Sequence, residues 1–176
     1  MNTIPRSEHP KPQFRRDSWM NLNGQWAFEI DNGRSGKARG LHQADAQLSD
    51  IILVPFCPQS ELSGVNHKDF LYGVWYRRTV DLTKEQLSGR AVLHFGAVDY
   101  HCEAFVNGVS VGTHTGGYVS FCFDVTEAVH EGENVITVYA EDDERDPLIP
   151  RGKQSELFYS HGCDYTRTTG IWQTVW

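Results

Sequence analysis

Short runs of β-forming residues, separated by turn residues, constrain the fold of this chain more than any other feature. In the run 134–141, "NVITVYAE", the alternating residues Ile136, Val138 and Ala140 are all apolar, and the residues between them, Val135, Thr137 and Tyr139, are partly so. Successive side chains of a strand point to opposite faces of a sheet, so this pattern is typical of a strand buried in a β-sandwich. No segment shows the sustained 3.6-residue period of a long amphipathic helix. The sequence therefore predicts an all-β fold.

Other runs rich in β-branched and aromatic residues predict further strands over 26–30, 51–54, 74–80, 90–95, 101–106, 119–123 and 170–175. Asn107-Gly108 separates two such runs, and both residues readily adopt the positive φ of a two-residue hairpin. Thr83 and Gln86 have capping-box spacing, which predicts one helical turn. Together these signals predict a jelly-roll β-sandwich of two antiparallel sheets with eight or nine strands.

The 176 residues fit one domain with its own core. Residues 1–13 are rich in proline and predict an extended N-terminal arm, and residues 14–176 form the domain. The acidic run 141–144 leaves the sheet and opens a loop of roughly thirty residues, a length that in compact domains usually serves a function. The acidic run is expected to be either a cation ligand or an ordinary solvated loop.

Composition excludes some classes of partner. The formal net charge is −7 and no basic patch is visible, which argues against a nucleic-acid partner. The chain shows no apolar signal region and no membrane span, so we expect no membrane partner and a cytoplasmic location. The four cysteines form no CxxC pair and lie mostly in apolar runs, which favours buried free thiols.

Local motifs for catalysis are weak. Residues 108–112 fit the G-x-S-x-G pattern, but Ser110 follows a hairpin rather than the strand-to-helix turn that a nucleophile elbow requires. An esterase built on Ser110 is therefore a minor alternative. No local pattern marks the facing pair of carboxylates that a glycosidase needs. The sequence predicts no catalytic residue in this chain.

The sequence also contains only weak signals for a metal site. The segment 161–164, His-Gly-Cys-Asp, is the densest cluster, but structural zinc usually recruits ligand pairs from two segments and only one is present. Loop carboxylates could instead hold a hard cation through oxygen, and the candidates are Asp142, Asp143, Asp146 and Asp164. Aromatic side chains next to polar loops could stack on a sugar, although a place in the core is the favoured reading for each: Trp75, Tyr118, Trp172 and Trp176.

Four stretches, read together, resemble one family. They are "ILVPFCPQSELSG", "GVWYRRTVDL", the run from "AVLHFG" to "NVITVYAEDD" that contains "VNGVSVGTHTGGY", and "DYTRTTGIWQTVW". In this order and spacing they resemble the N-terminal sugar-binding domain of glycoside hydrolase family 2, which includes β-galactosidases, β-glucuronidases and β-mannosidases. The resemblance covers about residues 14–176 and implies a galactose-binding-domain-like jelly roll.

The resemblance also implies a longer parent protein. Family members are retaining glycosidases whose two catalytic glutamates lie in a (β/α)₈ barrel that follows this domain and an immunoglobulin-like one. A barrel takes about 250 residues, so this chain cannot contain it. The implied partners are a carbohydrate substrate, most simply a β-galactoside, and the downstream domains; the parent can be a homo-oligomer. No cofactor is required, although a monovalent or divalent cation can bind in the parent.

One family residue can be carried over to this sequence. An aspartate six residues before the glycine of the Gly-Ile pair contacts the sugar in family members, and that position is Asp164. In some β-galactosidases the same aspartate ligates a monovalent cation. The alternative is a loop residue that caps a turn. Arg167 is a second candidate for substrate contact, or an ion-pair partner that shapes the loop. An asparagine that reaches the sugar in galactosidases has no clear equivalent here, and Asn66 is the nearest candidate.

Two functions from different classes remain open. The first is a non-catalytic domain that forms one wall of a parent glycosidase site. The second is a free-standing carbohydrate-binding module or lectin that works through exposed aromatic side chains and has no hydrolase partner.

Overall fold

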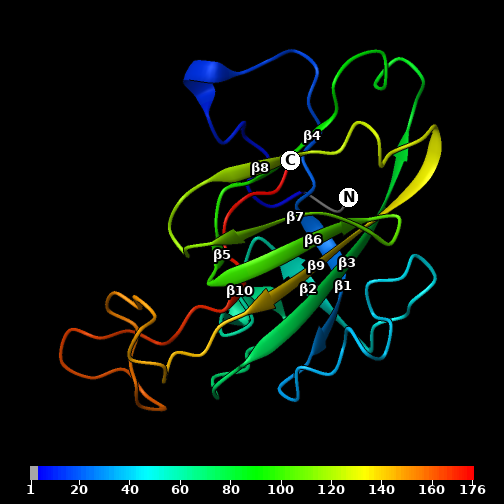
Figure 1. Cartoon of the computed structure of the whole chain (residues 1–176). Helices are drawn as coiled ribbons and strands as arrows, with labels where there is room; N and C mark the ends of the chain where they lie inside the picture. The colour runs from blue at the N-terminus through cyan, green and yellow to red at the C-terminus, as the bar shows by residue number, and fades with distance from the viewer. Residues whose placement is uncertain (1–3) are drawn as a thin grey trace.

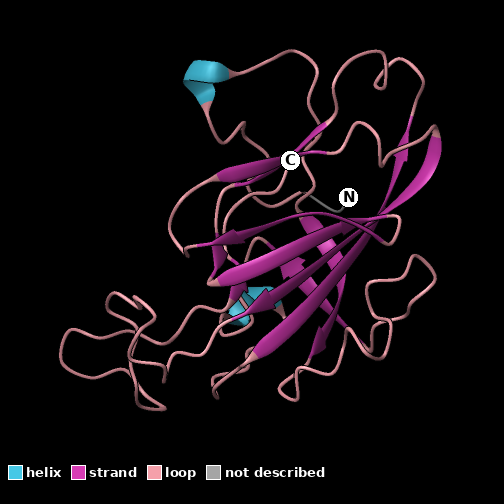
Figure 2. Cartoon of the chain, in the orientation of Figure 1, coloured by secondary structure: helices cyan, strands magenta, loops and turns pink. Residues whose placement is uncertain are grey.

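The computed structural model describes residues 4–176 and shows a two-layered β-structure (Figures 1 and 2). The larger layer is a six-stranded sheet whose neighbouring pairs are all antiparallel, in the order β2-β1-β3-β9-β6-β7. Its strands are β1 (Gly24–Ile30), β2 (Asp50–Val54), β3 (Gly73–Leu82), β6 (His101–Val106), β7 (Val109–Thr115) and β9 (Gly132–Glu141). The described residues form two short 3₁₀ helices, Pro12–Phe14 and Glu61–Ser63, and no helix long and apolar enough to cross a membrane.

The smaller layer is built from two short strand pairs and the end of the chain. β4 (Val92–Phe95) pairs with β8 (Phe121–Asp124), and β5 (Val98–Asp99) pairs with β10 (Gly170–Ile171). The last residues lie along β4: Val175 bridges Phe95, and His94 and Trp176 exchange two backbone hydrogen bonds of 2.8 and 3.1 Å. These pairings satisfy the backbone groups of the final segment, which is therefore part of the fold.

The core lies between the two layers. Ile136, Val138 and Ala140 of β9 are buried in it, as their alternation predicts. The other side of the six-stranded sheet carries a second apolar cluster around Trp75 and Tyr139, whose rings stack with centroids 4.7 Å apart. The segment 31–49 covers this cluster with its own apolar side chains. The six-stranded sheet is thus buried on both faces near its middle.

The all-β prediction is confirmed, with ten strands in place of eight or nine. The Asn107-Gly108 hairpin is present, and β5 is a two-residue strand too short to leave a sequence pattern. The strand predicted over 170–175 is regular only at Gly170–Ile171, and the one predicted from 119 begins at Phe121. Thr83 and Gln86 make the reciprocal capping-box bonds, at 2.8 and 3.4 Å, around a single turn.

All four cysteines are free, as predicted, but only part of the burial prediction is right. Cys102 is buried and Cys57 is half-buried, whereas Cys122 and Cys163 are exposed. Cys122 lies on β8 between Phe121 and Phe123, and these two neighbours pack against the core. Because strand side chains alternate between faces, the residue between two inward side chains points outward.

Gly170 starts β10 with φ +74°, and a Cβ at this position would overlap the hydroxyl of buried Tyr76. That hydroxyl accepts the Ile171 amide at 3.2 Å. We expect Gly170→Ala to destabilise the chain by about 2–3 kcal/mol, since positive φ and overpacking both oppose it. The measurement is urea unfolding followed by tryptophan fluorescence.

Gly64→Ala is the matched control, because Gly64 has φ +83° and a Cβ there would meet nothing within 4 Å. This variant carries the backbone strain without the overlap, so it should lose about 1 kcal/mol. Equal losses for the two glycines would show that Tyr76 does not restrict the backbone at Gly170.

Candidate functional site

The long loop, residues 142–169, runs from the end of β9 to β10 and extends away from the sandwich (orange in Figure 1). It contains turns and two isolated bridges, Gln154 with Tyr165 and His161 with Asp164. This is the long loop that the sequence predicts. Its ends continue directly from β9 and into β10, so these two strands fix the points where the loop leaves the sheets.

Asp164 lies in the second half of this loop, before β10. It closes a tight turn with His161, in which the two residues exchange backbone hydrogen bonds of 3.2 and 2.8 Å. Its side chain is 28% exposed, and Oδ2 lies 3.8 Å from His161 Nε2. The Asp164 carboxylate is therefore held by a defined turn and remains accessible from outside the domain.

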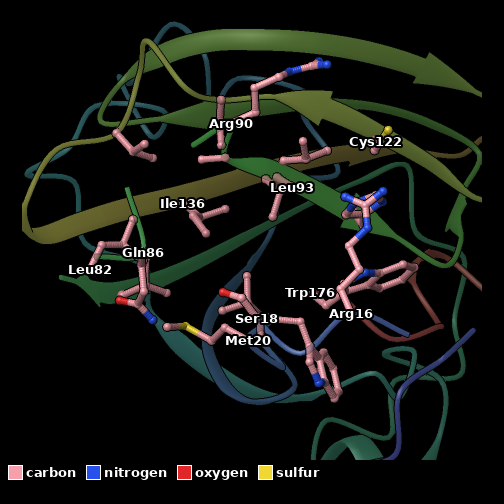
Figure 3. Close-up of a pocket in the computed structure, with 18 of the residues that line it drawn as sticks. Arg16, Ser18, Met20, Leu82, Gln86, Arg90, Leu93, Cys122, Ile136 and Trp176 are labelled. Carbon is pink, nitrogen blue, oxygen red and sulfur yellow. The ribbon is translucent and has the colours of Figure 1, made fainter. Parts of the chain in front are cut away.

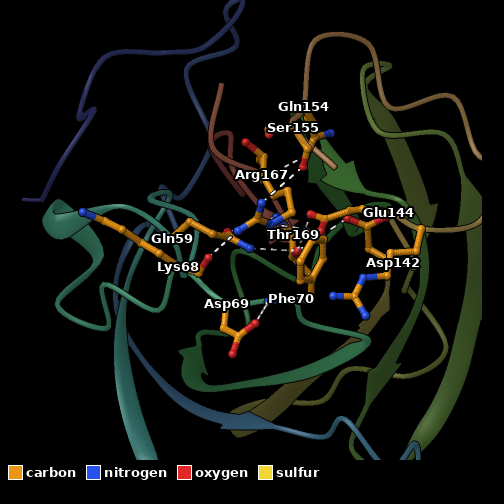
Figure 4. Close-up of polar contacts among 12 residues, drawn as sticks. Gln59, Lys68, Asp69, Phe70, Asp142, Glu144, Gln154, Ser155, Arg167 and Thr169 are labelled. Atoms are coloured by element: carbon orange, nitrogen blue, oxygen red, sulfur yellow. Dashed lines mark hydrogen bonds and ion pairs between the residues drawn. The ribbon is translucent and has the colours of Figure 1, made fainter. Parts of the chain in front are cut away.

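Arg167 lies at the base of the long loop, and its side chain is completely buried (Figure 4). Its Nε is 3.4 Å from Glu144 Oε2, which forms an ion pair. Its other nitrogens donate to the carbonyls of Ser155, Leu157 and Lys68. In this structure Arg167 joins both ends of the loop to the segment at Lys68, which is the loop-shaping role that the sequence analysis offered as its alternative.

The guanidinium of Arg167 also stacks on Phe70. Its Cζ is 4.2 Å from the centre of that ring, and the Cζ of Arg145 is 3.8 Å from it. The Phe70 ring meets Phe158 of the long loop edge to face, with centroids 5.1 Å apart. Contacts of a cation with an aromatic face are strongest where water is excluded, so they add to the anchoring of the loop.

Three buried carboxyl groups surround this anchor: Asp99, Asp142 and Glu144. The Thr169 hydroxyl lies 3.4 Å from both Asp142 and Glu144, and Gln154 donates to Asp99 at 2.8 Å. Arg167 is the one cation paired with this group among the described residues. The acidic run is thus not an ordinary solvated loop, because two of its carboxyl groups are buried.

Burial is the main cause of the raised pKa values of these three carboxyl groups. It raises the pKa of Asp99 to about 6. It also raises the pKa of Asp142, and the nearby Asp99 and Glu144 raise it further. The pKa of Glu144 is raised by burial while the Arg167 charge opposes the rise. Burial thus favours the protonated form of both carboxyl groups, and the Arg167 charge favours the ionised form of Glu144.

The pH dependence of stability follows from these directions. A carboxyl group with a raised pKa binds more protons in the folded state than in the unfolded chain, where its pKa is about 4. Its contribution to stability is complete below pH 4 and is lost as the pH rises. We expect the free energy of unfolding to fall between pH 5 and 8, by up to about 1.4 kcal/mol per pH unit for each extra bound proton.

Asp142→Asn tests this assignment, because the amide resembles the protonated acid but cannot ionise. The variant should be more stable than the wild type at pH 8, and its urea midpoint should change less with pH. Asp143→Asn, at a half-exposed carboxylate 3.6 Å from Arg34, is the control and should keep the wild-type slope. A wild-type slope in Asp142→Asn would contradict the assignment.

The structure separates the carboxylates proposed as ligands of a hard cation. Asp142 is buried, Asp143 pairs with Arg34, and Asp146 accepts the Leu148 amide at 2.9 Å. Within residues 4–176, the group of three potential ligands close enough for one ion consists of Glu156, His161 and Asp164. The segment 161–164 therefore contributes two of these ligands, and Glu156 is a partner that the sequence analysis missed.

The remaining candidates lie elsewhere. Ser110 lies on β7, and its hydroxyl donates to Glu103 at 2.8 Å. Glu103 in turn pairs with Lys37, and no strand-to-helix turn is present at Ser110, so the nucleophile elbow is absent there. Asn66 is exposed with φ +52°, two residues before the Lys68 carbonyl that accepts from Arg167.

Exposed aromatic side chains occur on the long loop itself. Phe158, Tyr159 and Tyr165 are 59, 65 and 63% exposed. Of the four aromatics singled out from the sequence, Trp75 is fully buried in the core and Tyr118 is exposed. The sequence analysis did not single out the loop aromatics, although "LFYS" inside a polar loop is the signal that could have found them.

A cavity beside the N-terminal arm is a separate feature. It has a volume of about 580 Å³ and is lined by the N-terminal arm, by core residues such as Leu93 and Ile136, and by Trp176 (Figure 3). The cationic side chains at this cavity are Lys11, Arg16 and Arg90. None of its lining residues belongs to the long loop, so it does not include Asp164.

Comparison with known proteins gives consistent matches. Residues 19–175 match the family model described as "Glycosyl hydrolases family 2, sugar binding domain". A β-galactosidase of Thermoanaerobacter pseudethanolicus is 32% identical over 111 residues, covering 62% of this chain and 14% of that protein. A putative β-glucuronidase of Formosa agariphila is 26% identical over 166 residues, covering 94% of this chain and 19% of that protein.

Solved structures match as well. A β-glucuronidase from Ruminococcus gnavus, in complex with D-glucaro 1,5-lactone, superposes with a TM-score of 0.74. At 19% identity this likeness shows the fold, over 93% of this chain and 30% of that one. The chain thus spans less than a third of the length of each of these relatives.

Proposed function

Because this chain belongs to the sugar-binding domain family of glycosyl hydrolase family 2, we propose that it forms one wall of the substrate site in a longer retaining β-glycosidase. One observation carries the proposal: Asp164 presents a partly exposed carboxylate on a loop that a buried ion pair anchors to the sandwich. A carboxylate can accept hydrogen bonds from two neighbouring sugar hydroxyls, and such charge-assisted bonds are strong. The chain contributes binding and orientation, and the catalytic carboxylates lie in another domain.

The surface of the long loop supports a shared site. Besides its three exposed aromatics, the loop exposes 87% of Leu148. Grouped apolar side chains at a surface mark contact with another protein part or a ligand. We propose that these side chains pack against the catalytic domain and that Asp164 is thereby directed to the bound sugar.

The substrate class is a terminal β-glycoside. We propose a β-galactoside, as the sequence resemblance suggests. A β-glucuronide is the second candidate, because the similar proteins include several that are named as glucuronidases as well as two that are named as galactosidases. Assays of the longer protein with nitrophenyl β-galactoside and nitrophenyl β-glucuronide distinguish the two. If the longer protein hydrolyses neither compound, the proposal is contradicted.

A free-standing carbohydrate-binding module is the competing function, and the exposed Phe158, Tyr159 and Tyr165 favour it. Calorimetry of this 176-residue chain with galactose, glucuronate and their disaccharides separates the two. A module should bind alone, with a Kd of about 1 mM or tighter, whereas one wall of a shared site should give no measurable heat. Binding by the isolated chain would favour the module.

A further inference from the structure

Glu156, His161 and Asp164 form a compact group on the long loop, in which one ligand atom of each residue lies within 4.8 Å of the others. His161 Nε2 is at the centre, 3.7 Å from Glu156 Oε2 and 3.8 Å from Asp164 Oδ2. The turn that closes at Asp164 places His161 and Asp164 together, and Glu156 approaches from the earlier part of the loop. Residues from two separate segments of the loop therefore converge on one point.

His161 Nε2 is the observation that points to a ligand. This atom is shielded from solvent, yet it has no hydrogen-bond partner. The imidazole as a whole is 34% exposed, and its Nε2 faces one oxygen of Glu156 and one oxygen of Asp164 at 3.7 and 3.8 Å, which is longer than a hydrogen bond but within reach of a shared ion. A cation that binds nitrogen as well as oxygen would satisfy all three atoms at once.

The donor set selects the class of ion. One imidazole nitrogen and two carboxylate oxygens suit a divalent first-row transition ion such as Zn²⁺, whereas Ca²⁺ and Mg²⁺ prefer oxygen ligands alone. Tetrahedral bonds of about 2.0–2.2 Å place ligand atoms roughly 3.3–3.5 Å apart. The observed separations of 3.7 and 3.8 Å need only a small closing movement of the side chains.

Two neighbours affect the site. Arg151 lies 3.3 Å from Glu156 Oε2, so its charge competes with a cation for that carboxylate. Cys163 is exposed, and its Sγ lies 3.8 Å from Asp164 Oδ1, on the other carboxylate oxygen. The Arg151 charge lowers the affinity for a cation but does not block its binding, because the Arg151 side chain is partly exposed and can move into solvent.

We propose that Glu156, His161 and Asp164 bind one divalent transition-metal ion of the Zn²⁺ class, with one coordination position left open to solvent. The ion would fix the outer turn of the long loop. It would also occupy the carboxylate of Asp164, so metal and sugar would compete for this residue; that consequence rests on the proposed function, whereas metal binding itself does not.

The experiment is a calorimetric titration of the 176-residue chain with ZnCl₂, together with the visible absorption spectrum of the Co²⁺ form. We expect one ion per chain with a Kd of about 10 µM or tighter. His161→Gln and Glu156→Gln should each weaken binding at least about tenfold. His130→Gln, at an exposed turn on another part of the chain, is the control and should leave binding unchanged.

Several results would overturn the assignment. They are no binding at millimolar Zn²⁺, equal binding by His161→Gln and the wild type, or loss of binding in Cys163→Ser, which would place the ion on the thiolate. Unchanged binding in Cys163→Ser supports the three-ligand site. Because this titration uses neither sugar nor hydrolysis, its failure would leave the proposed function untouched.

Discussion

Replacing Asp164 with alanine in the longer glycosidase is expected to lower kcat/KM by about 10²- to 10³-fold, equivalent to about 3–4 kcal/mol of transition-state stabilisation. A hydrogen bond to a charged group contributes about 1.5–3 kcal/mol, and the Asp164 carboxylate can accept two from neighbouring hydroxyls. The loss should appear with the preferred β-glycoside. It is measured by initial rates over a range of substrate concentrations.

Asp146→Ala is the matched control for this prediction. Asp146 lies on the same loop, but its carboxylate caps a local turn through the Leu148 amide at 2.9 Å. This variant should keep kcat/KM within about twofold of the wild type, since it removes a surface interaction that does not touch the site. Equal kinetics for Asp164→Ala and Asp146→Ala would show that Asp164 makes no contact with the sugar.

Arg167→Met is expected to destabilise the 176-residue chain by about 3–5 kcal/mol near pH 7. Methionine retains much of the side-chain volume but leaves the Glu144 carboxylate buried without its cation, and an uncompensated buried charge has a cost of this size. The variant also loses the hydrogen bonds to three backbone carbonyls. Urea unfolding followed by tryptophan fluorescence gives the free energy.

The loss in Arg167→Met should be smaller at pH 5. Burial raises the pKa of Glu144, so acid neutralises the carboxyl that the variant leaves unpaired. Arg151→Met is the control, because Arg151 forms a partly exposed ion pair with Glu156 at 3.3 Å. Removal of such a surface pair should cost less than about 1 kcal/mol. A similar loss for both arginines would contradict the anchoring role of Arg167.

The sandwich could be predicted from the sequence because its signals are local. The alternation in 134–141 gave the buried face of β9, and Asn107-Gly108 gave a hairpin. β5 could not be predicted, since a two-residue strand has no period and depends on pairing with β10, about seventy residues later in the chain. The exposure of Cys122 was open to prediction, because the two flanking phenylalanines share the opposite face of the same strand.

The ion pairs of the long loop could not be predicted from the sequence. Its length is predictable, but the composition of the acidic run predicts only a cation ligand or a solvated segment. In the structure the strand alternation continues past β9: Glu141 and Asp143 pair with Arg34 at the surface, and Asp142 and Glu144 turn inward. The pairing of Glu144 with Arg167 joins residues far apart in the sequence, and no local pattern specifies such a partner.

The cluster of Glu156, His161 and Asp164 was also only partly predictable from the sequence. His161 and Asp164 were singled out as neighbours in one short segment. Glu156 joins them only because the loop folds back on itself, which brings an acidic residue of no distinctive spacing to within 3.7 Å of the imidazole. Neighbours within one short segment could thus be singled out from the sequence, whereas a partner that loop geometry supplies could not.

If this domain shapes the site of a longer glycosidase, as we propose, then the domain alone does not perform the chemistry. The most direct measurement compares the 176-residue chain and the longer protein in one hydrolysis assay with nitrophenyl β-galactoside and nitrophenyl β-glucuronide. We predict hydrolysis of at least one compound by the longer protein, and a rate equal to that of buffer for the chain alone. A rate well above buffer for the chain alone would contradict this proposal, because the catalytic groups would then lie within these 176 residues.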